Sequence, residues 1–589
     1  MNSEQKTPYR IQIVPGIWIV AGVLLLCAVR IAWEWANYPH DIKRLARELS
    51  SINVIQQPPV VNHAGTLIGV VHTTEQGVGV FTVNAETQVE RKLAEVNDVD
   101  YVKPEFAHIF GWSPNDKFFA FSVNTNLHFL SDSGEESVCG IDLSNSIYPF
   151  GMQPFTWLSQ KTCAYIDRNP KLVILQYTDG QWQETTSWLL PTTNGKPQSL
   201  QAVNTNMVAW QTDNTLWQIN ISSGAIAPIY SDPPNIIRHI SYSKYKDAFL
   251  LVKNTNRLAA SSLIVFKNET NGSVINELTL KSPVLDAQWI DKGKEYAYVS
   301  AEGDHTVLTI KRETGDLVNT FFAAGQVWNI FCDGENSSVY ALAAKTNEPA
   351  GIWQCKAGSD DTSCIVSPWG NRDVEFHFQP ALKGQAEYLQ AGRHNATFDL
   401  VPPANFSRQK KYPLVIGTAG YEWTPIAHGV YAQCLANSGA YVALVNYRWN
   451  QNRPETVLNY TNNVLAVYNQ LIRNPNIDRN RVFLFGFSTG TVVVGELVKD
   501  FPGRWRGIML FNPTQLPEER NGMTMRVLAT GGSGEMEEDR FQRYQEQLLK
   551  VGIPMDWYID ANSGHVPRNK TAMYERALSM ADMVFEEKW

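Results

Sequence analysis

The sequence has little of several features that would place it in other classes of protein. Its 589 residues contain no low-complexity block, only 7 cysteines and a mild formal charge of −8. No basic cluster occurs outside the N-terminal region, so the positive surface that nucleic-acid binding requires is missing. We therefore expect no nucleic-acid partner, and we predict neither a metal nor another cofactor. The chain is also too long for a single hydrophobic core, so two or more domains are expected.

Long hydrophobic runs are equally scarce, with one exception near the start of the chain. Residues 11–29 contain no charged side chain, and the mostly apolar stretch 11–33 is long enough to cross a bilayer as a helix. The alternative is a cleaved signal peptide, but no small-residue cleavage site follows the run. Basic residues lie on both sides of it, so the positive-inside rule leaves the topology open. We expect a single-pass membrane anchor at residues 11–33.

The few cysteines allow two disulfide bonds. Cys355 and Cys364 flank a short polar loop between two strand-like runs, as in a hairpin closed by a disulfide. Cys139 and Cys163 are a second possible pair. Such bonds would indicate an oxidising compartment, whereas free buried cysteines in a cytosolic protein fit the same spacing.

Helical periodicity is almost absent between residues 55 and 390. Short alternating runs separated by Gly, Asn, Asp and Ser turns predict strands throughout this region. A loose unit of about forty to fifty residues repeats, in which an aromatic residue precedes a turn and a second strand. Such units occur at Trp112, Trp157, Trp289 and Trp328. Four-stranded propeller blades have this length, so we expect an all-β propeller of about seven blades. A pair of large β-sandwiches is the alternative.

The pattern changes from about Ala396 onward, where strand-like and helical runs alternate. The helical runs are Pro454–Arg473, Thr491–Lys499, Glu537–Val551 and Lys570–Glu587. This alternation predicts a mostly parallel sheet covered on both faces. We therefore divide the chain into three parts. Residues 1–54 hold a tail, the anchor and a short amphipathic linker helix near His40–Leu49, residues 55–390 form the propeller, and residues 391–589 form an α/β domain.

Ser488 lies in a Gly-x-Ser-x-Gly sequence, Gly486 to Gly490, in the α/β domain. The apolar strand Arg481–Phe485 precedes it and a predicted helix follows. This is the context of a nucleophile elbow, in which the glycines permit a sharp turn and close helix packing, and the serine hydroxyl projects above the sheet. The alternative is a tight turn with an inert serine. We predict that Ser488 is the nucleophile of a serine hydrolase with an α/β-hydrolase fold.

A serine nucleophile needs a base to take its proton and an acid that orients the base. His565 follows the last predicted strand and precedes the last helix, which is where this fold carries its histidine. A surface histidine is the alternative. The acid is expected in the loop after the strand Arg526–Ala529, where Glu535 is our first choice and Asp539 the second. The predicted triad is therefore Ser488, His565 and Glu535.

An oxyanion hole needs donors where charge develops on the carbonyl oxygen. We predict one donor at the backbone N–H of Thr489, directly after the nucleophile. The other should come from the loop that follows the strand Pro413–Gly417, where Thr418 or Tyr421 could add a hydroxyl.

These motifs resemble those of the prolyl oligopeptidase and dipeptidyl peptidase IV family of serine peptidases. The similar stretches are Val401–Phe406, Lys410–Val415, Asn476–Val482, which leads into Gly486–Gly490, and then Gly552–Pro554 and Gly564–His565. The resemblance implies that an N-terminal propeller caps a hydrolase site and restricts it to short or unstructured peptides. An N-terminal membrane anchor resembles the dipeptidyl peptidase branch.

The chain departs from the family pattern at several positions. Thr489 and Thr491 stand where the family has Tyr and Gly, and Thr418 stands at the aromatic oxyanion donor. The segment Asn512–Thr524 is short where the family supplies aromatic walls for a proline ring, so proline specificity stays open. The pair Glu135-Glu136 resembles an amine-binding acidic pair, but a solvated turn is the favoured interpretation.

Three functions are consistent with these observations. The first is a membrane-anchored serine peptidase, periplasmic or extracellular, that cleaves a peptide through an acyl-enzyme. The second is an esterase that acts on a small acyl substrate with the same residues. The third is a catalytically inactive protein that binds partners through its propeller.

Overall fold

The computed structural model describes most of the chain between residues 42 and 585. The described ranges are 42–55, 59–96, 107–123, 126–140, 154–193, 195–233, 235–254, 261–268, 273–280, 282–302, 305–322, 326–332, 334–344, 350–368, 379, 381–389, 393–418, 430–446, 455–517, 525–533, 536–560 and 569–585. The apolar residues 11–33 lie outside these ranges. Within the ranges, no helix combines the length and the hydropathy that crossing a membrane requires.

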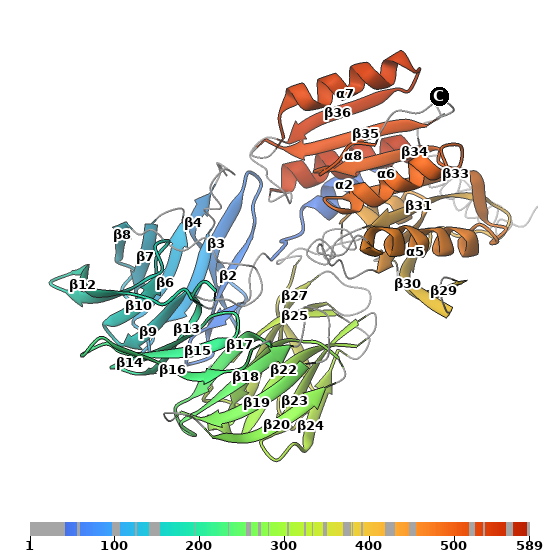
Figure 1. Ribbon diagram of the computed structural model, residues 1–589. Coiled ribbons are helices and arrows are strands. Elements are labelled where there is room, and N and C mark those ends of the chain that lie inside the picture. The colour runs from blue at the N-terminus through green and yellow to red at the C-terminus, as the bar shows by residue number, and fades with distance from the viewer. Residues whose placement is uncertain are drawn as a thin grey trace, which may run out of the picture.

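Seven four-stranded antiparallel sheets make up the described part of residues 60–366, and each is built from one continuous stretch of chain (Figure 1). The first three contain β1 (Val60–Val61), β2 (Leu67–Thr73), β3 (Val78–Asn84) and β4 (Glu90–Val96); β5 (His108–Trp112), β6 (Phe118–Val123), β7 (Asn126–Ser131) and β8 (Glu136–Gly140); β9 (Phe155–Ser159), β10 (Thr162–Ile166), β11 (Lys171–Thr178) and β12 (Gln181–Leu189). The next two contain β13 (Gln198–Asn204), β14 (Met207–Gln211), β15 (Thr215–Asn220) and β16 (Ala225–Ser231); β17 (Ile236–Ser243), β18 (Ala248–Asn254), β19 (Ser261–Lys267) and β20 (Val274–Leu280). The last two contain β21 (Val284–Ile290), β22 (Glu295–Glu302), β23 (His305–Arg312) and β24 (Leu317–Phe321); β25 (Gln326–Phe331), β26 (Ser338–Ala344), β27 (Gly351–Lys356) and β28 (Thr362–Val366).

The repeated aromatic units predicted from the sequence are the first strands of these sheets. Trp112, Trp157, Trp289 and Trp328 lie on β5, β9, β21 and β25. Seven hydrophobic clusters among the described residues each lie between two neighbouring sheets. One of them joins the first sheet to the seventh, through residues such as Val70 and Leu342, and so closes the ring. The prediction of a propeller with about seven blades is confirmed, and the β-sandwich alternative is wrong.

An eight-stranded sheet follows the propeller, in the order β29-β30-β32-β31-β33-β34-β35-β36. Its strands are β29 (Leu382–Leu389), β30 (Arg393–Val401), β31 (Tyr412–Thr418), β32 (Tyr441–Asn446), β33 (Ile477–Phe487), β34 (Gly507–Phe511), β35 (Arg526–Gly532) and β36 (Met555–Asp560). The strands from β32 to β36 pair in parallel, and β29 and β30 are antiparallel additions at one edge. The predicted alternation of strands and helices, and the mostly parallel sheet, are confirmed.

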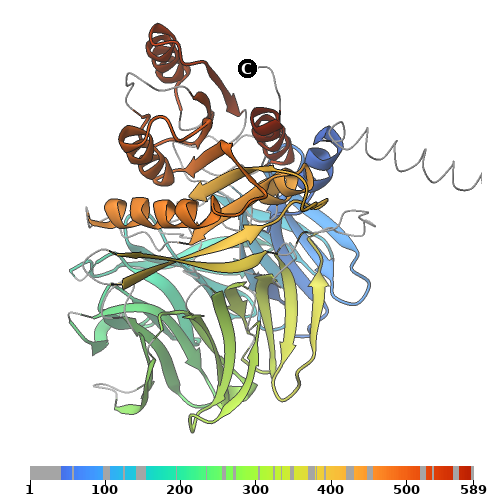
Figure 2. The ribbon, with the colours of Figure 1, turned by 90° about the vertical axis from the view of Figure 1, so that its right-hand side faces the viewer.

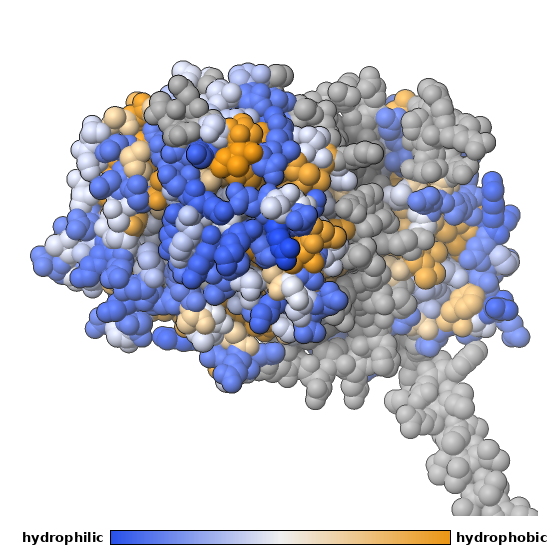
Figure 3. All heavy atoms as spheres, turned by 90° about the horizontal axis from the view of Figure 1, so that it is seen from below, coloured by the Kyte–Doolittle hydropathy of each residue, from blue (hydrophilic) through white to orange (hydrophobic). Residues whose placement is uncertain are grey.

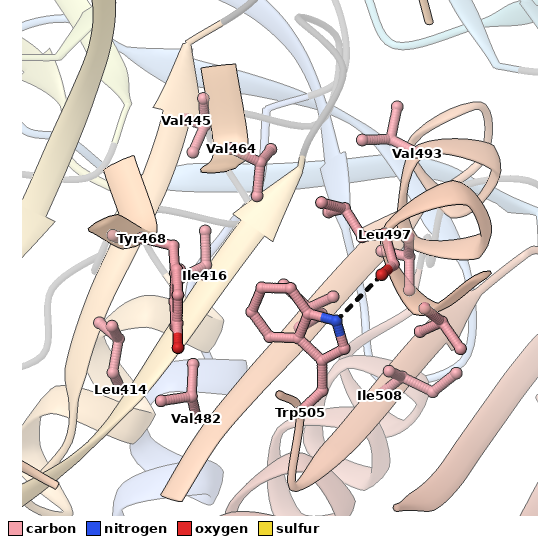
Figure 4. Packing of buried hydrophobic residues seen from close by; sticks show 14 of the residues in the cluster. Leu414, Ile416, Val445, Val464, Tyr468, Val482, Val493, Leu497, Trp505 and Ile508 are labelled. Atoms are coloured by element: carbon pink, nitrogen blue, oxygen red, sulfur yellow. Dashed lines mark hydrogen bonds between the residues drawn. The ribbon is translucent and has the colours of Figure 1, made fainter. Parts of the chain in front are cut away.

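Helices cover both faces of this sheet. The helices are α2 (Ile42–Ser50), α4 (Ala432–Asn437), α5 (Glu455–Leu471), α6 (Gly490–Asp500), α7 (Glu538–Lys550) and α8 (Lys570–Phe585). One core cluster contains residues of α5, α6 and α7, and the other contains residues of α2, α4 and α8. Figure 4 shows the first cluster around Trp505, whose indole N–H donates to the Leu497 carbonyl at 3.2 Å. The sheet is therefore buried on both sides, as its near-continuous apolar strands require.

The short N-terminal helix α2 belongs to this second unit. Its apolar residues Ala46 and Leu49 are buried in the same cluster as Met573 and Ala577 of α8. The predicted amphipathic helix is present, and its apolar side packs on the α/β unit instead of forming only a linker. Figure 2 shows α2, drawn in blue, beside the C-terminal helix.

The carboxyl edge of the sheet faces the propeller. Thr74, in the turn after β2, pairs with Asn569, which directly precedes α8. The Lys570 N–H donates to the Thr74 carbonyl at 2.9 Å, and the Thr571 hydroxyl donates to the Glu75 carbonyl at 3.0 Å. Because β36 ends shortly before Asn569, the carboxyl ends of the parallel strands point toward this contact.

Neither predicted disulfide bond forms. Cys355 pairs across the hairpin with Thr362, whereas Cys364 pairs with Trp353, so the two cysteines are diagonal neighbours. Diagonal positions lie about 7–8 Å apart, which is beyond the usual reach of a disulfide. Cys139 and Cys163 lie in one hydrophobic cluster as thiols. The disulfide prediction is therefore corrected, and the cysteines give no support for an oxidising compartment.

The visible underside of the molecule is mostly hydrophilic, and the hydrophobic residues in its coloured part gather in separate small patches (Figure 3). Scattered apolar residues of this kind are normal on a protein surface and do not by themselves mark a partner site.

Candidate active site

Ser488 lies at a sharp turn between β33 and α6. Its φ of 53° places it in the left-handed region, which a non-glycine residue adopts only under strain. The Ser488 N–H donates to the carbonyl of Phe511, at the end of the neighbouring strand β34, at 2.9 Å. Strained backbone held by surrounding structure is characteristic of functional sites, and a strained strand-to-helix turn is the geometry of a nucleophile elbow. The local structure predicted around Ser488 is confirmed.

The two glycines of the motif are required by close contacts. A Cβ atom on Gly486 would lie 2.9 Å from the Gly490 carbonyl oxygen. A Cβ atom on Gly490 would lie 2.3 Å from the Thr418 carbonyl oxygen. Helix α6 therefore begins directly against β31 and β33, at a distance that no other residue type permits.

Two threonine hydroxyls bind the carbonyl oxygen of Ser488. Thr491 donates to it through its hydroxyl at 2.5 Å and through its N–H at 3.0 Å. The Thr514 hydroxyl donates to the same oxygen at 3.3 Å. The threonine that departs from the family pattern at position 491 thus stabilises the strained turn, and Thr514 brings the segment after β34 beside the nucleophile.

The Thr489 N–H is well placed for the predicted oxyanion hole. Thr489 directly precedes α6, is half-buried, and its N–H meets no acceptor among the described residues. The positive end of the helix dipole adds to its attraction for an anion. This observation supports the prediction for Thr489 without testing it.

The Thr418 hydroxyl lies elsewhere than predicted. Thr418 is fully buried, and its hydroxyl lies within hydrogen-bond distance of the Phe485 carbonyl at 3.1 Å and the Gly490 carbonyl at 3.2 Å. A hydroxyl has one proton, so donation to these carbonyls leaves none for a substrate. The Thr418 hydroxyl therefore holds β31 against the elbow and does not serve the oxyanion hole. Tyr421, the other candidate, lies outside the described residues.

The structure does not describe the other two members of the predicted triad. His565 and Glu535 both lie outside the described residues, so their roles stay predictions. The second-choice acid, Asp539, lies exposed in the first turn of α7. An acid in a triad is normally buried beside the histidine, so the position of Asp539 argues against it. β35 ends at Gly532, three positions before Glu535 in the sequence.

A buried ion pair near the elbow was not predicted from the sequence. Arg576 on α8 and Asp560 at the end of β36 are both fully buried and bonded to each other. Arg576 also donates to the Asn512 side chain at 2.9 Å. Burial raises the pKa of the Asp560 carboxyl, and the Arg576 guanidinium opposes that shift. No signal in the sequence pointed to this pair, because Arg576 follows Glu575 in a helix of mixed composition.

Two other expectations concern the rest of the described chain. Glu135 and Glu136 lie exposed at the β7–β8 turn, and Glu136 bonds His128 at 2.6 Å. They thus occupy a solvated turn at the outer edge of a blade, as the favoured interpretation had it.

No group of metal-ligating side chains occurs in the part of the chain that the structure describes.

Comparison with known proteins identifies the fold. No protein-family model and no curated protein sequence matches the chain. Among solved structures, a prolyl endopeptidase is similar with a TM-score of 0.69 at 13% identity, covering 93% of this chain and 91% of that one. A puromycin-hydrolysing peptidase of Mycobacterium tuberculosis has a TM-score of 0.67 at 12% identity, covering 92% and 96%. Oligopeptidase B of Trypanosoma brucei has a TM-score of 0.65 at 11% identity, covering 94% and 91%.

These similarities extend over both units of the chain. The protein therefore has the two-domain fold of the prolyl oligopeptidase peptidases, with a seven-bladed propeller. By the same likeness, the eight-stranded unit has an α/β-hydrolase fold.

Proposed function

We propose that this protein is a membrane-anchored serine peptidase that hydrolyses short peptides through an acyl-enzyme. The observation that carries the proposal is Ser488, held in a strained elbow at the edge of the sheet that faces the propeller. The fold supports it, because similar solved structures are of peptidases.

In the proposed mechanism, Ser488 Oγ attacks the scissile carbonyl and His565 takes its proton. His565 returns that proton to the leaving amine, and water then hydrolyses the acyl-enzyme by the same route. The Thr489 N–H stabilises the oxyanion, and Glu535 orients the imidazole. The parts given to His565 and Glu535 rest on their positions in the sequence.

The substrate is a short or unstructured peptide, because a propeller above the site restricts access to it. The residues beside the nucleophile do not favour proline. Thr514, whose hydroxyl lies 3.3 Å from the Ser488 carbonyl oxygen, is polar and exposed. The segment Asn512–Pro517 has no aromatic residue that could stack on a proline ring. A small acyl ester remains the second candidate substrate.

The anchor is residues 11–33, and the catalytic part lies outside the cytoplasm. The anchor rests on the mostly apolar composition of that stretch, in which residues 11–29 carry no charge and Arg30 is the one charged residue. The location of the catalytic part rests on the resemblance of an N-terminal anchor to that of the dipeptidyl peptidase branch.

A labelling experiment tests the proposal. The full-length chain, extracted in detergent, is treated with a fluorophosphonate probe, and Ser488→Ala is the matched control. We expect labelling of the wild type and none of the variant. A wild-type chain that takes up no probe would favour the inactive binding protein. With labelling established, peptides with and without proline are compared with aryl esters, and cleavage of esters alone would contradict a peptidase.

A further inference from the structure

The buried guanidinium of Arg576 joins the ends of two strands in the α/β unit. Its Nε donates to Asp560 Oδ2 at 2.6 Å, and its Nη2 donates to Asn512 Oδ1 at 2.9 Å. Nη2 also contacts the same Asp560 oxygen. The guanidinium carbon of Arg576 lies 5.1 Å from the centre of the Phe511 ring. A planar guanidinium bonded in two directions fixes the relative position of its partners.

One partner of Arg576 neighbours a residue that contacts Ser488, and the other lies shortly before His565 in the sequence. Asn512 follows Phe511, whose carbonyl accepts the Ser488 N–H at 2.9 Å. Asp560 is the last residue of β36, five positions before His565 in the sequence. The chain of contacts therefore runs from the nucleophile, through Arg576, to the strand end from which the histidine segment leaves.

The backbones of Asn512 and Asp560 are also hydrogen-bonded to residues of β35 or directly after it, between β34 and β36. The Asp560 carbonyl accepts the Ser533 N–H at 3.0 Å, directly after β35. The Asn512 N–H donates to the Thr530 carbonyl of β35 at 2.8 Å. Three adjacent strand ends at the carboxyl edge, those of β34, β35 and β36, are thus connected to one another.

A contribution to stability does not by itself explain the buried ion pair of Arg576 and Asp560. Replacement of a buried ion pair by apolar residues of similar volume is often neutral or stabilising, because desolvation offsets the attraction. Within the described chain, Asp560 Oδ1 and Arg576 Nη1 are also buried without a hydrogen-bond partner, which adds a further penalty. What the pair does supply is directional bonds between separate elements.

We propose that Arg576, with Asp560 and Asn512, is a positioning residue that sets the spacing between the Ser488 elbow and the end of β36. This inference rests on the proposed function, because the spacing matters for catalysis only if Ser488 and His565 react together. Loss of the positioning lowers kcat and leaves KM nearly unchanged, since none of the three side chains needs to touch the substrate.

The test removes the ion pair without leaving an unpaired buried charge. The variant Asp560→Leu/Arg576→Met replaces both charges by apolar side chains. The control, Arg526→Met/Asp556→Leu, removes the partly exposed pair at the other end of β35 and β36. We expect kcat to fall about 10²-fold in the first variant, with KM within about twofold, and no change in the control. Arg576→Lys keeps the charge but not the fork of donors, so its kcat should lie between those of wild type and the double variant.

A second measurement does not depend on activity. Hydrogen exchange of the Ser488 and Ser533 amides reports on the order of the strand ends that Asn512 and Asp560 connect. The Val527 amide, at the other end of β35, is an internal reference. Faster exchange at Ser488 and Ser533 in Asp560→Leu/Arg576→Met, but not at Val527, supports the positioning role. Unchanged exchange together with wild-type kcat overturns it. A wild-type chain that takes up no fluorophosphonate overturns the proposed function instead, and the exchange then still decides whether the pair positions the strand ends.

Discussion

Gly490→Ala tests whether close contact between α6 and β31 shapes the nucleophile elbow. Two effects oppose each other in this variant. Alanine favours a helix over glycine by about 1 kcal/mol, which predicts a more stable protein. The added Cβ would lie 2.3 Å from the Thr418 carbonyl oxygen and 2.7 Å from its hydroxyl oxygen, which predicts a clash.

The clash should prevail because the atom it meets is fixed. Thr418 lies at the end of β31, in the register that pairs it with Gly486, and its hydroxyl is bonded inward. Separation of the Cβ from the carbonyl oxygen to about 3.0 Å requires a shift of about 0.7 Å in the elbow. Overpacking of this kind costs about 1–3 kcal/mol, and a displacement approaching 1 Å near a nucleophile lowers kcat on the order of tenfold to 100-fold.

The assays are thermal unfolding and the rate of fluorophosphonate labelling. The overpacking cost less the gain of about 1 kcal/mol in helix propensity leaves a net loss centred on about 1 kcal/mol, so for a unit of this size we expect Tm to fall by about 2–4 °C, and the labelling rate to fall with kcat. Gly503→Ala is the control, because a Cβ there would meet no atom within 4 Å. It should be neutral or slightly stabilising. If Gly490→Ala labels at the wild-type rate and unfolds at or above the wild-type Tm, close contact with β31 does not shape the elbow.

Three other predictions concern the elbow and one buried cysteine. Ser488→Gly and Ser488→Ala should both abolish labelling, but the glycine variant should be more stable by about 1 kcal/mol, because only glycine adopts a φ of 53° without strain. Equal Tm values for the two would contradict a strained elbow. Thr491→Val keeps the shape of the buried side chain but loses the hydroxyl that donates to the Ser488 carbonyl, so it should lower the free energy of unfolding by about 1 kcal/mol in urea. An unchanged free energy of unfolding would show that this bond does not stabilise the elbow. Burial raises the pKa of the Cys434 thiol to about 12, so its reactive thiolate is scarce at pH 8. Iodoacetamide should modify Cys434 only after unfolding, and rapid modification of the native chain would show that the thiol is accessible.

The sequence by itself determined the features that depend on neighbouring residues. Strand runs, turns and repeated aromatic residues at a regular spacing predicted the propeller, because each blade is one continuous stretch of chain. The strand before Ser488, the two glycines and the helix after it predicted the elbow, since all of these lie within a few residues. The alternation of strands and helices likewise predicted a parallel sheet.

Only the tertiary structure decided which distant side chains meet. Thr418 turns its hydroxyl toward Phe485 and Gly490 because two strands far apart in sequence are neighbours in the sheet. The register of the β27–β28 hairpin pairs Cys355 with Thr362 and Trp353 with Cys364, and the spacing of the two cysteines in the sequence does not fix that register. Asn512, Asp560 and Arg576 come together because the ends of β34 and β36 lie against α8 in a shared core. Long-range packing alone brings such groups into contact, so no local pattern in the sequence could reveal them.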